Sequence, residues 1–292
     1  MSTASRLIEK LFVLSGAAKD ISAKKFYGKL RKNAIRYQRG DRILPRFFGV
    51  KTEKGIYCGM RYYLFTPKEV DSVKSVMYVH GSGYMNGHGR CHLRFAVDIA
   101  RNTHAKVYFP IYPKLPNSTV LSTYALLNNF YAFLRKRSEV FLVGDSSGGA
   151  LVLALAAEKE EIRDVIAISP WVSLKIGEEG RAVSTDVMLS LSVLDRAARL
   201  WAYDLDPENV KLSPINGDYA GKRLLIFSGE KEVFRPDIAR FCREKEKGGA
   251  SVTYVEGAGQ QHCYPLMPTP EGRDARECVY RRLHGALYGE GE

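Results

Sequence analysis

The chain of 292 residues is long enough for one large α/β domain or two small ones. Its hydrophobic content of 45% and charged content of 26% are ordinary for a globular protein. Every apolar run is broken by charge or glycine well before the roughly 18 residues that a membrane span needs. Five scattered cysteines without a Cys-x-x-Cys pair predict free thiols rather than disulfides or a zinc site. With no secretory signal at the start, we expect a cytoplasmic protein.

The net charge of +12 is concentrated near the N-terminus, where residues 1–51 hold thirteen lysines and arginines against three acidic residues. We interpret residues 1–45 as a basic segment with helices over 5–14 and 24–36, because apolar residues recur there at helical spacing. The favoured role is a cap, and the alternative is weak contact with a membrane surface. No DNA- or RNA-binding motif accompanies the charge, so nucleic acid is not an expected partner. In the cap role, the side chains expected to pack inward are Leu7, Ile8, Leu11, Phe12 and Leu14.

From residue 46 onward, strands and helices alternate. A hairpin is expected from strands over 46–50 and 56–66, with Glu53, Lys54 and Gly55 as its turn. Buried strands are expected over 74–80, 105–112, 140–143, 165–169, 223–229 and 252–257. Helices are expected over 92–102, 119–136, 236–247 and 270–288, and directly after Ser146. Residues 172–213 hold a helical stretch but no core strand, and we interpret them as an insertion. The alternation predicts an α/β protein with a mostly parallel central sheet and helices on both faces.

The pattern Gly-x-Ser-x-Gly occupies residues 144–148, between a β-favouring apolar run and a run rich in Ala and Leu. In a strand, sharp turn and helix, Ser146 stands at the apex with its Oγ clear of the sheet. Gly144 and Gly148 leave room, because a Cβ at either position would crowd the strand against the helix. The N-terminus of that helix directs its amides and its dipole at any oxyanion formed there. We therefore predict that Ser146 is a nucleophile.

A serine hydroxyl needs a base to take its proton, and the base needs a carboxylate to orient it. Of six histidines, only His262 follows Ser146 on a loop at the end of a strand, since His284 falls in the terminal helix. The loop after the strand ending near residue 229 offers the carboxylates of Glu230, Glu232 and Asp237. The residues alone leave the choice among these acids open.

Another strand end carries the run His80-Gly-Ser-Gly-Tyr84. A small, flexible turn in this place can aim backbone amides at the carbonyl oxygen that is attacked, as an oxyanion hole does. We predict the amides of Gly81 and Ser82 as donors, joined by that of Ser147.

These motifs resemble those of the hormone-sensitive-lipase group of carboxylesterases, which are α/β-hydrolases, over about residues 60–290. Residues 80–84 correspond to the family's His-Gly-Gly-Gly-aromatic motif and residues 144–149 to its Gly-Asp-Ser-Ala-Gly-Gly motif. The resemblance implies a triad of Ser146, Glu232 and His262, with Tyr84 in contact with the substrate. Asp237 is the rival acid, five residues on, and Glu232 is favoured because Asp237 is expected to lie already in a helix. Two residues depart from the family pattern: Glu232 stands where the family usually has Asp, and Ser82 replaces the middle glycine. The resemblance also implies that residues 1–45 and the insertion over about 172–213 form a cap on an α/β-hydrolase domain of residues 46–292.

The expected activity is therefore that of a serine carboxylesterase, which hydrolyses small-molecule acyl esters through an acyl-enzyme without a metal or cofactor. An amidase or deacetylase on the same triad is the alternative within this chemistry. A non-catalytic ligand-binding protein on the same fold is the alternative from another class. The presence of both Ser146 and His262 argues against that second alternative.

Overall fold

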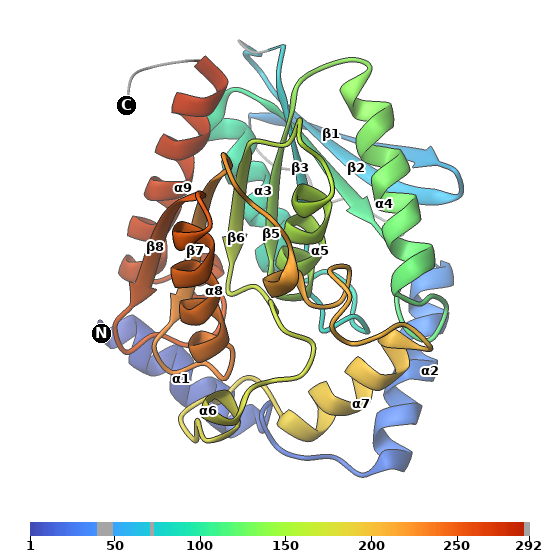
Figure 1. Cartoon of the computed structure of the whole chain (residues 1–292), viewed down its shortest axis with the longest axis vertical. Helices are drawn as coiled ribbons and strands as arrows, with labels where there is room; N and C mark the ends of the chain where they lie inside the picture. Colours follow the sequence, from blue (N-terminus) through green and yellow to red (C-terminus); the bar gives the residue numbers. More distant parts are fainter. Residues whose placement is uncertain (40–48, 71–72, 289–292) are drawn as a thin grey trace.

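The computed structural model describes residues 1–39, 49–70 and 73–288, and within them eight strands form a single sheet (Figure 1). The strand order is β1-β2-β4-β3-β5-β6-β7-β8. The pairs β1–β2 and β2–β4 are antiparallel, and all other neighbouring pairs are parallel. The predicted mostly parallel sheet is confirmed. The strands are β1 (Val50–Tyr57), β2 (Met60–Pro67), β3 (Ser75–Val79), β4 (Lys106–Ile111), β5 (Val140–Asp145), β6 (Asp164–Ile168), β7 (Arg223–Gly229) and β8 (Ser251–Gly257).

Helices cover both faces of the sheet, as predicted. On one face lie α3 (Arg90–Thr103) and α9 (Pro270–Tyr288). On the other lie α4 (Val120–Arg135), α5 (Ser146–Ala157) and α8 (Arg235–Lys247). Because both faces are covered, every residue of the central strands β3 and β5 is buried, which explains their unbroken apolar sequences.

The predicted hairpin is present, but its turn lies elsewhere. The strand β1 runs through residues 53–55 to Tyr57, and the chain reverses at Cys58 and Gly59. Both turn residues have a positive φ, 47° and 77°, which a two-residue hairpin turn requires. Gly55 serves packing instead, because a Cβ there would lie 2.1 Å from the ring of Tyr62. The expected strand residues 46–48 lie outside the described part of the chain.

The remaining helices lie at the end of the sheet where the parallel strands finish (Figure 1). They are α1 (Thr3–Ser15) and α2 (Ala23–Arg39) from the N-terminal segment, with α6 (Glu178–Arg181) and α7 (Leu191–Ala202) from the insertion. Asp20, between α1 and α2, accepts hydrogen bonds from the hydroxyls of Ser190 (2.7 Å) and Ser192 (2.6 Å) at the start of α7. The N-terminal segment and the insertion therefore pack against each other. In the described ranges, no helix combines the length and apolarity needed to cross a bilayer.

Candidate active site

Ser146 stands at the junction of β5 and α5 with a φ of +52°. Holding a non-glycine residue in this region costs about 1–3 kcal/mol, and the surroundings must enforce it. A Cβ on Gly144 would lie 2.6 Å from the carbonyl oxygen of Gly148, and one on Gly148 would lie 2.1 Å from that of Val79. Only glycine fits at either position, so the close approach of strand and helix that the motif implied is present.

The structure brings Ser146, His262 and Glu232 together. His262 Nε2 lies 3.0 Å from Ser146 Oγ, and His262 Nδ1 lies 2.5 Å from Glu232 Oε2. The three residues follow β5, β8 and β7, whose carboxyl ends meet at one edge of the sheet. All three are buried, with Glu232 fully enclosed. This geometry is that of a nucleophile, a base and a carboxylate in contact.

The pKa values of His262 and Glu232 are set by their burial and by their attraction for each other. Burial lowers the pKa of His262, but the Glu232 carboxylate, with Asp186 and Asp145 farther off, raises it above the ordinary value on balance. Burial raises the pKa of Glu232, and His262 offsets only part of that rise. Glu232 is also held in place by the Gly229 amide, which donates to its Oε1 at 3.2 Å.

Asp237, the rival carboxylate, has other partners. It accepts hydrogen bonds from the amide of Gly177 (3.0 Å) and from Arg240 (3.4 Å), and so ties α8 to the insertion. The carboxylate in contact with His262 is therefore Glu232.

Asp186, from the insertion, is a carboxylate that the sequence analysis did not single out. It accepts from the amide of Val233 at 3.0 Å, next to Glu232, and from the amides of Met188 and Leu189. It thus anchors the insertion to the loop that carries Glu232. Its position in a stretch without regular structure gave no periodic signal by which it could have been found.

The loop over residues 80–84, predicted to hold the oxyanion, has residues with different surroundings. A Cβ at Gly81 would lie 2.3 Å from Asp145 Oδ2, so Gly81 packs against the Asp145 side chain. The Ser82 amide donates to Ser147 Oγ at 3.0 Å. Gly83 has a φ of +58° with open space beside it, and its amide bonds to none of the residues that the structure describes.

Asp145 joins the nucleophile turn to the elements behind it. It accepts hydrogen bonds from Tyr78 Oη at 2.6 Å and lies 3.2 Å from His92 Nε2. Burial opposes the charge on His92, but Asp145 raises the pKa of His92 above its ordinary value. His92 Nδ1 accepts the Gly89 amide at 2.8 Å, which leaves Nε2–H to donate to Asp145. His92 precedes Ser146 and was therefore not a predicted site residue, although its contact with Asp145 fixes the position of α3 beside the turn.

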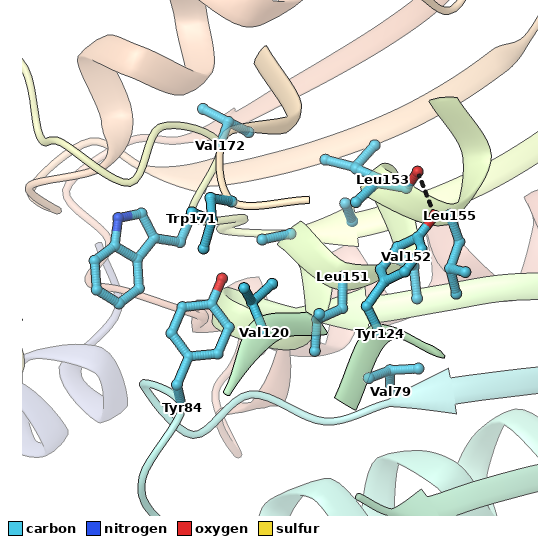
Figure 2. Close-up of a cluster of buried hydrophobic side chains, with 14 of the residues drawn as sticks. Val79, Tyr84, Val120, Tyr124, Leu151, Val152, Leu153, Leu155, Trp171 and Val172 are labelled. Carbon is cyan, nitrogen blue, oxygen red and sulfur yellow. Dashed lines mark hydrogen bonds between the residues drawn. The ribbon is translucent and has the colours of Figure 1, made fainter. Parts of the chain in front are cut away.

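Tyr84, predicted to contact substrate, is fully buried in a row of aromatic rings, and Figure 2 shows it beside Trp171. The row runs from Trp201 in α7 through Tyr84, Trp171 and Phe234 to His262, with successive centroids 4.5, 5.3, 5.3 and 5.4 Å apart. The Tyr84 hydroxyl and both indole nitrogens have no hydrogen-bond partner among the described residues. Tyr84 thus forms part of an aromatic wall that joins the insertion to His262.

All five cysteines are free, as predicted, and burial raises the pKa of the Cys263 thiol beside His262 well above its ordinary value. Among the described residues, no three His, Cys, Asp or Glu side chains are grouped to hold a metal ion.

Comparison with known proteins places these features in context. Residues 76–266 match the family model for the α/β-hydrolase fold. LipR of Mycobacterium tuberculosis, provisionally named an acetyl-hydrolase, is 24% identical over 82% of each chain. The esterase LipU of the same organism is 26% identical over 66% of this chain and 71% of its own. The crystal structure of an esterase from the bacterial hormone-sensitive lipase family superposes with a TM-score of 0.84 at 19% identity, covering 98% of this chain and 99% of that one.

Proposed function

Because this chain belongs to the α/β-hydrolase family, we propose that it is a serine carboxylesterase that cleaves small-molecule acyl esters through an acyl-enzyme. The observation that carries the proposal is the contact of Ser146 with His262 at 3.0 Å and of His262 with Glu232 at 2.5 Å. The chain order of nucleophile, acid and histidine is the order of this family. The ester-hydrolase names of the mycobacterial relatives support the same reaction class.

In the proposed mechanism, ionised Glu232 accepts a hydrogen bond from His262 Nδ1–H, which leaves Nε2 free to accept the proton of Ser146. Ser146 Oγ attacks the acyl carbon, and the proton moves to Nε2. The C–O bond to the alcohol then breaks as His262 returns the proton to the leaving oxygen. A water molecule, deprotonated by His262, attacks the acyl-enzyme. The bond to Ser146 Oγ then breaks as His262 returns the proton to Oγ, and the acid is released. Glu232 stabilises the imidazolium in both halves.

We assign the oxyanion hole to the amides of Ser82, Gly83 and Ser147. The Ser147 amide lies in the first turn of α5, where helix amides lack an intrahelical partner. Gly83, which has open space beside it, replaces the predicted Gly81, which packs against the Asp145 side chain. The Ser82 amide becomes available when the Ser147 hydroxyl rotates away from it.

We further assign residues 46–292 to the hydrolase domain, with residues 1–45 and 172–213 as its cap. The hydrogen bonds of Asp20 to Ser190 and Ser192 support a single cap built from two segments. Contacts of the cap with the catalytic loops support its place over the site: Lys231 pairs with Glu9 at 2.8 Å, and Asp186 accepts from the amide of Val233.

A series of p-nitrophenyl esters and p-nitroanilides with matched acyl chains tests the proposal. We expect turnover of the esters, fastest for one range of chain lengths, with much slower release from the anilides. A preference for anilides would favour the amidase alternative. Saturable ester binding without turnover would favour the non-catalytic one.

A further inference from the structure

Helix α1 has apolar side chains on two faces, and only one of them touches the protein. Its inner face seats Ile8 and Phe12 against the loop after β8, and Ser5 donates to Gln260 and Glu271. Its outer face carries leucines at positions 7, 11 and 14, which are 59%, 56% and 81% exposed. This spacing of four and three residues aligns the leucines along one stripe. The expectation that these leucines pack inward is wrong, because the helix contacts the body through its opposite side.

The charged side chains of the N-terminal segment are also divided between an inner and an outer face. Its described acidic residues face the protein, with Glu9 paired with Lys231 and Asp20 bound to serines of the insertion. The lysine and arginine side chains from Arg6 to Arg36 are exposed and make no ion pair with any carboxylate in the described ranges. Arg6 and Lys10 lie on α1, Lys19 lies in the connection to α2, and Lys24 and Lys25 lie at the start of α2. The exposed leucine stripe is thus on a helix whose exposed charged side chains are cationic.

We propose that α1 docks this protein on an anionic lipid surface, with Leu7, Leu11 and Leu14 inserted at the level of the headgroups. The leucines supply apolar area and the cations supply attraction to anionic lipids, the combination by which interfacial helices bind. A second copy of the chain is a poorer occupant, because two faces of the same positive sign repel each other. A neutral bilayer would accommodate the leucines but would offer no electrostatic attraction to the cations.

The docked helix lies directly on the loop that carries His262. Ser5 Oγ donates to Gln260 Oε1 at 3.2 Å, and Gln261 Nε2 donates to Glu9 Oε1 at 3.3 Å. In Figure 1, α1 lies at the end of the sheet where the strands finish. Docking therefore brings the candidate active site to the bilayer. If the proposed function holds, the substrates are acyl esters dissolved in, or part of, anionic membranes.

Sedimentation with phosphatidylcholine vesicles, with and without phosphatidylserine, tests docking apart from catalysis. The proteins are the full chain, Ser146→Ala, the triple variant Leu7→Ser, Leu11→Ser, Leu14→Ser, and the control Ile56→Ser. Ile56 is 74% exposed on β1, at the opposite edge of the sheet from β8. We expect the full chain, Ser146→Ala and Ile56→Ser to bind vesicles that contain phosphatidylserine. The triple variant should bind on the order of 100-fold more weakly, because the fold-losses expected for three partly buried leucine side chains multiply to about this factor.

Salt and charge provide a second readout. Binding of the full chain should weaken as salt is raised, because counterions screen exposed charges. Replacing Lys10 with Gln should weaken binding about fivefold, the equivalent of roughly 1 kcal/mol per charge near an anionic surface. Equal binding to both vesicle types, no binding to either, or equal binding by the triple variant would overturn the proposal. Self-association of the full chain that the triple variant abolishes, without vesicle binding, would assign the stripe to a second copy instead.

The substrate class is tested by hydrolysis of a long-chain ester held in vesicles. The full chain should hydrolyse it faster in vesicles with phosphatidylserine, and the triple variant should lose that gain while hydrolysing a soluble short-chain ester at the same rate. Vesicle binding by Ser146→Ala without hydrolysis of any ester by the full chain would retain the docking proposal and reject the proposed reaction.

Discussion

Tyr84 stacks on Trp201 with ring centroids 4.5 Å apart and ring planes 9° apart. The contact joins the oxyanion loop to helix α7 of the insertion, and both side chains are fully buried. Trp171 covers the other side of Tyr84 and donates its amide to the carbonyl of Ser146 at 3.2 Å. The wall of the candidate active site is therefore shared by the body and the insertion.

Replacing Trp201 by Ala should open a cavity beside Tyr84 and lower the free energy of unfolding by about 3–5 kcal/mol. Because that cavity adjoins the aromatic row that leads to His262, we expect the preferred acyl chain to lengthen. Trp201→Phe, which keeps a ring against Tyr84, should change both properties less. Denaturant unfolding and a chain-length series of p-nitrophenyl esters measure them. An unchanged chain-length profile in Trp201→Ala would show that these aromatic side chains do not determine which acyl chain is preferred.

Glu232→Gln should lower kcat by about 10⁴-fold, since a neutral amide neither holds the imidazole in the required tautomer nor stabilises the imidazolium. Asp237→Asn should leave kcat within a few-fold of the original and reduce stability, because Asp237 binds the Gly177 amide away from His262. Steady-state kinetics on both folded variants decide between the carboxylates. A larger catalytic loss in Asp237→Asn would reassign the acid.

The dependence of kcat/KM on pH should show an acid limb with its midpoint above 6.5, the ordinary pKa of histidine. His262 must be neutral to accept the proton of Ser146, and the buried Glu232 carboxylate raises the pKa of that ring. Activity should therefore fall as pH falls through the raised value. In Glu232→Gln the residual activity should have its acid limb at lower pH, because burial then acts without the opposing charge. A midpoint below 6.5 in the unsubstituted protein contradicts this account of the pair.

Ser147→Ala should raise kcat several-fold on short esters. The Ser147 hydroxyl accepts the Ser82 amide at 3.0 Å, and its removal frees that donor for the oxyanion, where one donor contributes about 2.7–4 kcal/mol. Ser147→Thr, which keeps the hydroxyl, is the matched control and should show no gain. A fall in kcat in Ser147→Ala would mean instead that the hydroxyl holds the loop in its working position.

The chain order and strand positions of Ser146, Glu232 and His262 were sufficient to predict that they meet. In a parallel sheet the carboxyl ends of neighbouring strands lie at one edge, so residues that follow β5, β7 and β8 converge whatever their separation in sequence. Gly144 and Gly148 were also predictable, because a close approach of strand and helix excludes a Cβ.

Other contacts could not be predicted from the local sequence pattern. The packing of Gly81 against Asp145, and the contact of Asp145 with His92, depend on how α3 packs behind the nucleophile turn. The apolar periodicity of α1 likewise predicts a helix but not which of its two apolar faces meets the protein. That choice follows from the polar contacts of Ser5 and Glu9 with distant residues, which no spacing rule reveals.

Rapid-quench mass spectrometry of the intact protein during turnover of a p-nitrophenyl ester tests the central claim most directly. The account predicts one acyl group per chain, located on Ser146, and no adduct in Ser146→Ala, whose turnover should fall by about 10⁴-fold or more. An acyl group on another residue, such as Cys263, or near-normal turnover by folded Ser146→Ala would contradict it.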